Sequence, residues 1–283
     1  SYICLQNISM YTEYQPSHLL VPYIDNYWEF KGNPDYGMRI HILPDGCTDF
    51  IFTLGEVANA VEEGSLIMQP YRSYFVGPMT KYSELVTYTE SIHMFGVRFL
   101  PCGLSCFTNL PLHEFVNSRV STNEMKAVFD DTFIEKLGEQ KHVTDRIRVV
   151  EEYLLAYLAR HYQPADSHVA MAVNMINHSK GKRSVRSLMD DVCLCQRHFE
   201  RKFKHYTGFT PKEYSRIVKF KNAVELLRTT TSANLLTTAV DAGYYDLAHF
   251  SKEIKSMSGN TPASFLSLTV PEETTLTYIE PQR

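Results

Sequence analysis

Two segments in the last third of the chain carry basic side chains at the spacing of one helix face. In the first segment, Arg197 and Arg201 lie four residues apart, so in a helix both side chains share a face. An arginine can donate two hydrogen bonds to the O6 and N7 atoms of guanine, a contact that distinguishes bases in the DNA major groove. The pattern predicts a DNA-reading helix, and the alternative is an ordinary solvated helix face.

The predicted DNA-contacting side chains form two sets, one in each segment. Glutamine can recognise adenine and glutamate cytosine, and small apolar side chains can touch the thymine methyl group. Lysine and histidine suit phosphates, which position a protein on DNA without reading its sequence. The first set is Gln196, Arg197, Glu200, Arg201 and Lys204, and the second is Leu247, Ala248, His249, Ser251, Lys252 and Lys255. For His249, packing on neighbouring side chains is an equal alternative to phosphate contact.

The two segments are copies of one unit. At an offset of 51 residues, His198-Phe199 recurs as His249-Phe250. In each copy, apolar residues at spacings of four and three face inward, behind a short helix and a tight turn. In the second copy, Gly243 supplies the positive φ of the turn, and Asp246 is the expected N-cap of the helix that follows. The arrangement predicts two helix-turn-helix motifs.

A well-marked helix separates the copies. Thr210 and Glu213 form a capping box around Pro211, which suits the first helical turn, and apolar residues continue the helix over 211–228. Eighteen residues span about 27 Å. A rigid spacer of this length could hold two recognition helices about one DNA turn, ~34 Å, apart.

Charge divides the chain into two parts. Residues 1–166 contain 12 Lys and Arg against 21 Asp and Glu, whereas residues 167–268 contain 15 against 8. Only the second part is therefore expected to meet a polyanion. The predicted organisation is a β-rich domain over 1–110, a helical connector or dimerisation region over 111–162, a DNA-binding domain over 168–268 and a polar tail over 269–283.

The N-terminal part predicts a sandwich or small barrel of short strands. Runs of β-branched and aromatic residues alternate with turn residues such as Pro44-Asp45-Gly46. The helical pattern of Asp145 to His161 then either covers the sheet or forms a dimer seam. The expected strands are Arg39 to Leu43, Asp49 to Leu54, Tyr71 to Val76, Ser83 to Tyr88 and Ile92 to Phe99.

The N-terminal part offers two candidate sites, and each has a structural alternative. The metal-ligating types His41, Asp45, Asp49 and His93 share no known ligand spacing, and no motif for nucleotide binding or hydrolysis occurs. We therefore predict no metal, no cofactor and no enzymatic activity. A pocket for a small anionic or aromatic effector is the other candidate, with structural roles as the alternative for each member. Its members are Trp28, Arg39, Tyr74 and Arg98.

The last hundred residues resemble the AraC/XylS family of bacterial transcription activators. The resemblance is carried by Gly243 to Lys252, by Lys255, by Gly259 to Phe265, and in the first copy by Gln196 to Tyr214. It implies an all-α domain of seven helices whose two recognition helices enter adjacent major-groove segments.

Three residues depart from the family pattern. Met189 and Cys193 stand where the family usually has alanine and glycine, and Thr238 replaces an aliphatic residue. The first motif is therefore expected to pack differently or to bind DNA with lower sequence specificity.

The N-terminal part resembles, less closely, a cupin-like module fused to some AraC-type regulators. In that wider family such a module binds an effector or mediates dimerisation. The resemblance lies in Pro22 to Trp28, Leu43 to Cys47, Val76 to Pro78 and Gly96 to Phe99.

The prediction is a bacterial α+β regulator of two domains that binds double-stranded DNA in the cytoplasm. No apolar run approaches the ~20 residues of a membrane span. Further expected partners are a small-molecule effector, a second copy of the chain and, for an activator, RNA polymerase. Two alternatives remain open: a cupin-type metalloenzyme that carries a DNA-binding module, and a ligand-free module that only dimerises.

Overall fold

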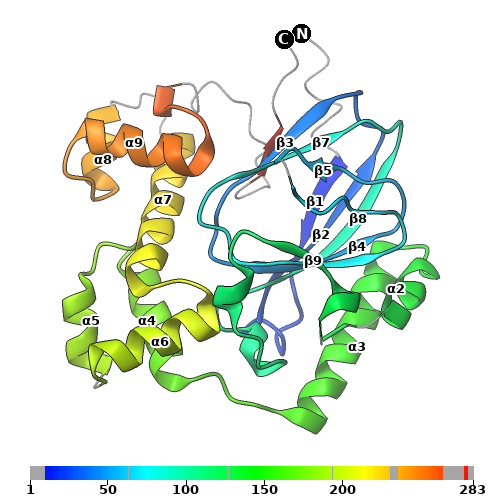
Figure 1. Ribbon diagram of the computed structural model, residues 1–283, viewed down its shortest axis with the longest axis horizontal. Helices are drawn as coiled ribbons and strands as arrows, with labels where there is room; N and C mark the ends of the chain where they lie inside the picture. Colours follow the sequence, from blue (N-terminus) through cyan, green and yellow to red (C-terminus); the bar gives the residue numbers. More distant parts are fainter. Residues whose placement is uncertain are drawn as a thin grey trace.

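The computed structural model describes residues 10–62, 64–125, 128–129, 131–192, 194–229, 235–263 and 277–279. These residues form a β-rich N-terminal domain and a helical C-terminal domain that lie side by side (Figure 1). The two-domain α+β architecture predicted from the sequence is confirmed. None of the described helices combines the length and apolar character that crossing a bilayer requires.

Two antiparallel sheets form the N-terminal domain. The larger has the strand order β1 (Tyr11–Tyr14), β2 (Ile24–Gly32), β8 (Ile92–Phe99), β4 (Thr48–Thr53), β6 (Ser73–Val76) and β9 (Arg119–Ser121). The smaller has the order β10 (Thr277–Ile279), β3 (Met38–Ile42), β7 (Ser83–Thr87) and β5 (Asn59–Ala60). Short 3₁₀ turns lie at η2 (Leu104–Cys106), η3 (Leu112–Phe115) and η4 (Thr122–Glu124).

The larger sheet separates two apolar cores because successive side chains of a strand point to opposite faces. In β4, Phe50 and Phe52 belong to one cluster and Ile51 to the other. The same alternation in β2 places Tyr27 on the first side and Trp28 on the second. Each buried side chain of this size contributes about 1.5–3 kcal/mol.

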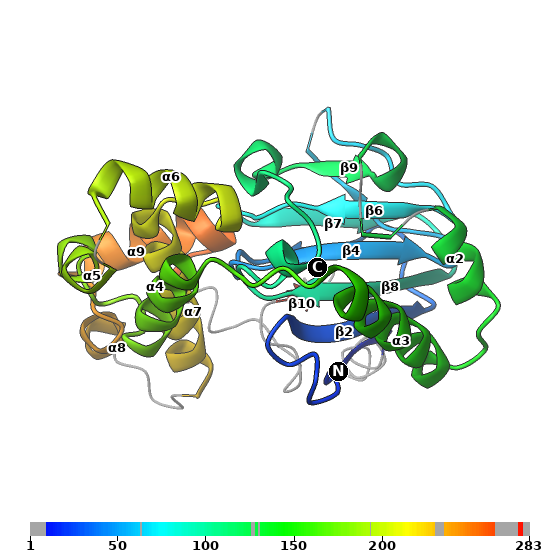
Figure 2. The same ribbon diagram turned by 90° about the horizontal axis from the view of Figure 1, so that it is seen from below.

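Connector helices α2 (Asp131–Gly138) and α3 (Val143–His161) cover the outer face of the larger sheet (Figure 2). Val150 and Leu154 of α3 are fully buried against the sheet side chains, while Arg148 and Glu152 remain exposed. The sequence allowed two roles for α3, covering the sheet or forming a dimer seam. Its apolar face covers the sheet.

Five predicted strands match β3, β4, β6, β7 and β8 to within two residues at either end. Five elements were not predicted as strands: β1, β2, β5, β9 and β10. The tail strand β10 pairs with β3, where Tyr278 lies opposite His41. The polar C-terminal tail thus returns a strand to the N-terminal domain, although most of residues 269–283 lie outside the described residues.

The C-terminal domain is helical throughout its described residues. Its helices are α4 (Ser167–His178), α5 (Val185–Val192), α6 (Gln196–Thr207), α7 (Pro211–Thr229), α8 (Leu235–Asp241) and α9 (Leu247–Ser258). Pro262 and Ala263 are helical again, where the resemblance implied a seventh helix, and the residues after them lie outside the described part of the chain.

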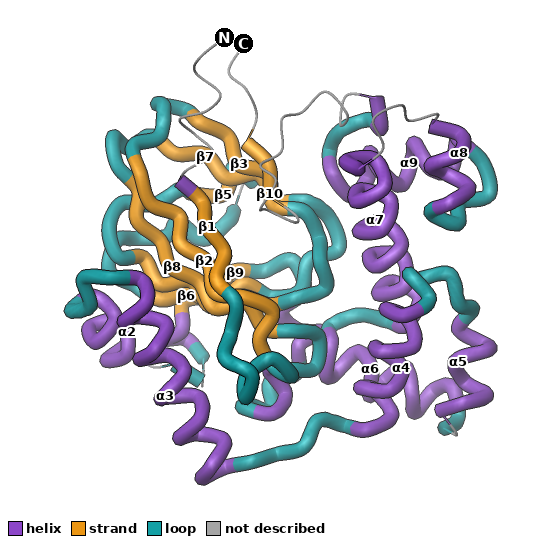
Figure 3. The backbone as a smooth tube through the Cα atoms, turned by 180° about the vertical axis from the view of Figure 1, so that it is seen from behind, coloured by secondary structure: helices purple, strands orange, loops and turns teal. Residues whose placement is uncertain are grey.

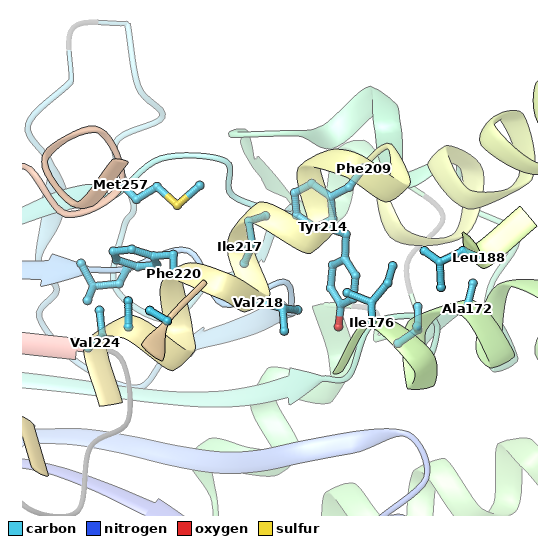
Figure 4. Packing of buried hydrophobic residues seen from close by; sticks show 14 of the residues in the cluster. Ala172, Ile176, Leu188, Phe209, Tyr214, Ile217, Val218, Phe220, Val224 and Met257 are labelled. Atoms are coloured by element: carbon cyan, nitrogen blue, oxygen red, sulfur yellow. The ribbon is translucent and has the colours of Figure 1, made fainter. Parts of the chain in front are cut away.

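A single apolar core joins the helices and extends into the other domain. Tyr214 and Val218 of α7 pack beside Ile176 of α4 (Figure 4). Leu43 and Cys102, which precede and follow strands of the N-terminal domain, belong to this same buried cluster. The two domains therefore share an apolar interface.

Candidate DNA-binding interface

The first helix-turn-helix unit consists of α5 and α6. Phe199 and Phe203 of α6 are fully buried, with their ring centroids 5.6 Å apart. The opposite side of α6 faces solvent, as the spacing predicted. Of the first predicted set, Gln196, Arg197, Arg201 and Lys204 are exposed and Glu200 is partly exposed.

Hydrogen bonds order part of this outer face. The Gln196 side-chain amide donates to the Glu200 carboxylate at 2.9 Å, and the Arg201 guanidinium lies 3.3 Å from Nδ1 of His198. No described residue pairs with the guanidinium of Arg197. Arg197 is therefore free to donate both of its paired N–H groups to a base edge.

The second unit consists of α8 and α9, joined by the turn that the sequence predicted. Gly243 has φ +85°, a conformation that glycine adopts without steric cost. The Asp246 carboxylate accepts a hydrogen bond from the His249 backbone N–H at 2.7 Å, which confirms the predicted N-cap. Of the second predicted set, Leu247, Ala248, His249, Lys252 and Lys255 are exposed and Ser251 is partly exposed.

His249 sits where both of its predicted roles remain available. Its ring packs edge-on against Tyr244, with centroids 5.5 Å apart, and its side chain still faces solvent. The Tyr244 ring also lies under the Lys219 ammonium at 5.6 Å. The start of α9 is thereby held on α7.

The helix between the units is capped as predicted. The Thr210 backbone N–H donates to the Glu213 carboxylate at 2.7 Å, and the Glu213 N–H donates to the Thr210 hydroxyl at 3.1 Å. Helix α7 has 19 residues, which at 1.5 Å per residue gives a length of about 28 Å. Figures 1 and 3 show α6 and α9 at opposite ends of this helix.

A forked ion pair fixes the second recognition helix to α7. The Arg216 guanidinium donates two hydrogen bonds, each 3.0 Å long, to the two carboxylate oxygens of Glu253. Paired contacts of this kind restrict orientation as well as distance. The pair therefore restricts the orientation of α9 on α7.

Both recognition helices end against the N-terminal domain, a feature that the sequence did not reveal. Gly208 and Gly259 close α6 and α9 in the left-handed conformation. A Cβ on Gly208 would lie 2.5 Å from Cγ of Pro78, and one on Gly259 would lie 2.7 Å from Cζ of Tyr82. Their first turns, where the predicted base contacts begin, stay exposed.

Basic side chains just before α5 make contacts within the domain. Lys182 donates to the backbone carbonyl of Asp241 at 2.6 Å, at the end of α8. Arg183 forms an ion pair with Asp191, and the Ser184 hydroxyl caps α5 by accepting from the Ser187 N–H at 3.1 Å. These side chains connect helices within the domain.

The four candidate effector residues divide into three places. Trp28 and Arg98 donate to the same carboxylate, Asp49, at 2.7 and 3.2 Å. The Tyr74 hydroxyl accepts from a loop N–H at 2.7 Å, and Arg39 forms an ion pair with Glu84 on the smaller sheet. The structure brings only Trp28 and Arg98 together on one group. Burial raises the pKa of the Asp49 carboxyl, and the Arg98 guanidinium opposes that shift.

The four metal-ligating residues that the sequence singled out occupy three places. The His41 ring stacks on Tyr82 with centroids 5.8 Å apart, whereas Nε2 of His93 lies 2.9 Å from the Glu29 carboxylate on the larger sheet. Asp45 and Asp49 both face Arg98. Among the residues that the structure describes, no group of three or more His, Cys, Asp or Glu is placed to hold a metal ion.

Two family profiles match the chain. One, described as a helix-turn-helix domain, covers residues 188–267 and so includes both recognition helices. The other, a domain of unknown function called DUF6597, covers residues 12–121. A search of curated protein sequences finds no match.

Among solved structures, ToxT from Vibrio cholerae is similar over both domains. It is 9% identical, and the alignment covers 85% of this chain and 98% of ToxT with a TM-score of 0.50. A probable AraC family transcriptional regulator from Rhodopseudomonas palustris is 20% identical over 36% of this chain and 96% of its own, with a TM-score of 0.33. The C-terminal domain of AraT from Geobacillus stearothermophilus is 20% identical over 40% and 94%, with a TM-score of 0.35.

The helix-turn-helix match and the shared two-domain fold agree with the paired recognition helices and with the residues that carry the resemblance. The C-terminal part of the chain therefore contains a helix-turn-helix domain, and the two-domain fold of the chain is similar to that of ToxT.

Proposed function

We propose that α6 and α9 enter neighbouring major-groove segments of one DNA duplex. The observation that supports this most directly is that the outer faces of both helices are solvent-exposed while α7 holds the two helices at its opposite ends. In this proposal Arg197, Gln196 and Glu200 read base edges, and lysines of both helices contact phosphates. Leu247 and Ala248 supply apolar contacts to thymine methyl groups.

Selection of bound duplexes from a random DNA library, with the full chain, tests the proposal. We expect enrichment of a bipartite site whose two parts lie about one helical turn, ~10.5 base pairs, apart. Affinity for the selected site should fall steeply with salt, because phosphate contacts release counterions. Recovery of no enriched sequence would refute base reading, and a single undivided site would refute joint use of the two helices.

The N-terminal domain is the proposed regulatory part. We infer that it binds a small-molecule effector, that two copies of the chain associate on DNA, and that an activating complex contacts RNA polymerase. The proposed parts are 1–110 for sensing, 111–162 as connector, 168–268 for DNA binding and 269–283 as tail. Since the target is chromosomal DNA, we place the protein in the bacterial cytoplasm.

We further propose that the chain catalyses no reaction. The ion pair of His93 with Glu29 and the convergence of Asp45 and Asp49 on Arg98 assign these metal-ligating side chains to structural contacts. Elemental analysis of the purified protein checks this proposal, since stoichiometric iron, manganese or zinc would instead favour a cupin-type metalloenzyme. Sedimentation of the protein with and without its selected DNA tests self-association.

A further inference from the structure

A cavity of about 290 Å³ lies between the two domains, away from the outer faces of the recognition helices. Its N-terminal wall comes from β2, from the turn between β3 and β4, and from the segment after β8. Its helical wall comes from the end of α4 and from one side of α7. This volume suits a small metabolite better than a long chain or a macromolecule.

One side chain in the cavity lacks hydrogen-bond partners. Asn222 of α7 lines the cavity and is only 5% exposed. Both its amide oxygen and its amide nitrogen are buried without a partner among the described residues. Buried polar atoms are nearly always paired in native proteins, and leaving them unpaired is costly. A polar ligand in the cavity would supply the partners that these two atoms lack among the described residues.

The two walls of the cavity carry charges of opposite sign. Asp25 and Asp45 line the N-terminal wall, and Lys180 and Lys221 line the helical wall. Glu225 adds one carboxylate at the exposed edge of the helical wall. A ligand that carries both charges would satisfy both walls at once.

Some of these charged side chains already have partners within the protein, and others could pair with a ligand. The Asp45 carboxylate accepts the Cys47 N–H at 2.8 Å and lies 3.5 Å from Arg98, so it is already partnered. The Lys221 ammonium donates across the cavity to the Asp45 backbone carbonyl at 3.3 Å. Burial raises the pKa of the half-buried Asp25 carboxyl, and Arg98 and Lys221 oppose that shift. A ligand cation beside Asp25 would favour its charged form.

We propose that this cavity binds a free amino acid or a similarly small zwitterion. The ammonium group of the ligand pairs with Asp25, and its carboxylate lies toward Lys180 and Lys221. Asn222 supplies one hydrogen-bond donor and one acceptor to its polar atoms. This inference rests on the proposed effector-responsive role of the protein and names the chemistry of the effector.

The position of the cavity links ligand binding to DNA binding. Helix α7 carries one recognition unit at each end, and the same helix forms the helical wall. A ligand that bridges the walls ties α7 to the N-terminal domain, and therefore changes the freedom of α6 and α9 to align on one duplex. A ligand shifts such an equilibrium only by its difference in affinity for the two arrangements.

Calorimetric titration of the full chain tests the proposal. The probes are each of the twenty L-amino acids, the diamine putrescine and the fatty acid oleate. We expect one amino acid, or a few related ones, to bind with a stoichiometry of one. In Asp25→Asn and in Asn222→Leu the affinity should fall about tenfold to a hundredfold, the range for losing a hydrogen bond to a charged group.

Matched controls separate ligand loss from misfolding. Asn174→Leu, on an exposed side of α4, should leave the affinity unchanged. Asn222→Leu removes two unpaired polar atoms, so its unfolding midpoint in urea without ligand should equal or exceed that of the parent. A folded Asn222→Leu variant that still binds the amino acid with parental affinity overturns the proposal.

The remaining outcomes also decide the matter. Binding of no amino acid overturns the proposal, as does binding of putrescine alone, which would indicate a cation site, or of oleate alone, which would indicate a site for amphipathic acids. Titrations contain no DNA, so their failure leaves DNA recognition standing. Arg197→Ala should lose DNA binding and keep parental ligand affinity, which distinguishes failure of the proposed function from failure of this inference.

Discussion

The two helix-turn-helix units are copies of one sequence pattern, yet their turns and caps differ. In the second unit, Gly243 makes the turn with φ +85°, and the Asp246 side chain caps α9. The corresponding cap position of α6 is Cys195, which makes no side-chain cap hydrogen bond. The two copies share the buried face and the glycine that ends each recognition helix, whereas the N-terminal ends of these helices differ.

The outer faces differ in chemistry as well. Helix α6 presents Arg197, Gln196 and Glu200, which can read bases by hydrogen bonds. Helix α9 begins with Leu247 and Ala248, which can offer only apolar contacts. We therefore expect the first unit to supply most of the base discrimination and the second, with its capped helix and its ion pair to α7, to act mainly as a rigid anchor on the DNA backbone.

The largest expected effect tests the shared buried face. Phe203 and Ile254 occupy matching positions and are both fully buried, but Phe203 also packs its ring 5.6 Å from Phe199 and 5.8 Å from Tyr214. We expect Phe203→Ala to lower the free energy of unfolding by about 3–5 kcal/mol. Ile254→Ala should cost less because it lacks the ring contacts, which are worth about 0.5–1.5 kcal/mol. Urea unfolding measures both, and the reverse order would contradict the contribution assigned to the ring contacts of Phe203.

The second prediction concerns the division of DNA recognition. Arg197→Ala should weaken binding to the selected site by about 1–3 kcal/mol and relax the preference at one base pair. Lys252→Ala should weaken binding to all sequences alike and reduce the slope of affinity against salt by about one. Mobility shifts on the selected site and on single-base variants measure both effects.

Controls for these variants come from exposed residues outside the domain. Arg148→Ala on α3 and Lys136→Ala on α2 remove comparable charges and should leave DNA affinity unchanged. If Lys252→Ala relaxes base preference more than Arg197→Ala does, the roles assigned to the two helices are reversed.

The third prediction exchanges the caps. Asp246→Ala removes the acceptor of the His249 N–H and should lower the free energy of unfolding by about 0.5–2 kcal/mol. Cys195 is exposed, with φ −66° and ψ 144°, the extended geometry that a capping side chain needs. Cys195→Asp should therefore raise the free energy of unfolding by about 0.5–1 kcal/mol. A destabilised Cys195→Asp variant would show that the two turns are not interchangeable.

The smallest expected effect lies at the contact of each unit with the N-terminal domain. His205 of α6 faces His113 of η3, with ring centroids 6.4 Å apart. Burial lowers the pKa of His205, His113 adds to the shift and Glu114 opposes it. The folded state therefore binds this proton less readily than the unfolded state. The resulting stabilisation is present at pH values above the pKa of histidine in the unfolded chain, near 6.5. It is lost as the pH falls toward the lower pKa of His205 in the folded state.

Urea unfolding at pH 7.5 and pH 5.5 measures this linkage. The parent should lose more stability on acidification than His205→Gln does. Equal pH dependence in the parent and in His205→Gln would show that His205 does not contribute to the pH dependence of stability.

Local signals in the sequence predicted the helical domain well. Thr210, Pro211 and Glu213 determined the start of α7, and Gly243 and Asp246 determined the turn and start of α9, because these features depend on neighbours in the chain. Strands with clear turn residues on both sides, such as β4, were also predicted. The sheet order was not, since strand partners such as β2 and β8 are far apart in sequence.

The candidate sites also differ in whether they depend on local or long-range structure. The polar outer faces of α6 and α9 followed from helical periodicity, so every predicted DNA-contacting residue lies on an exposed or partly exposed surface. The effector candidates did not converge: Arg39 lies on the smaller sheet, while Trp28 and Arg98 share Asp49. Residue type alone does not indicate which strands become neighbours.

The amino-acid sequence by itself determined the duplicated helix-turn-helix units, their caps and the chemistry of their outer faces. These depend on hydrogen bonds and periodicities within a few residues of one another. Only the tertiary structure decided that both recognition helices end on the N-terminal domain and that Asn222 and Asp25 face one cavity. Such contacts join residues nearly two hundred positions apart, and they exist only because both domains bury apolar surface in the same core.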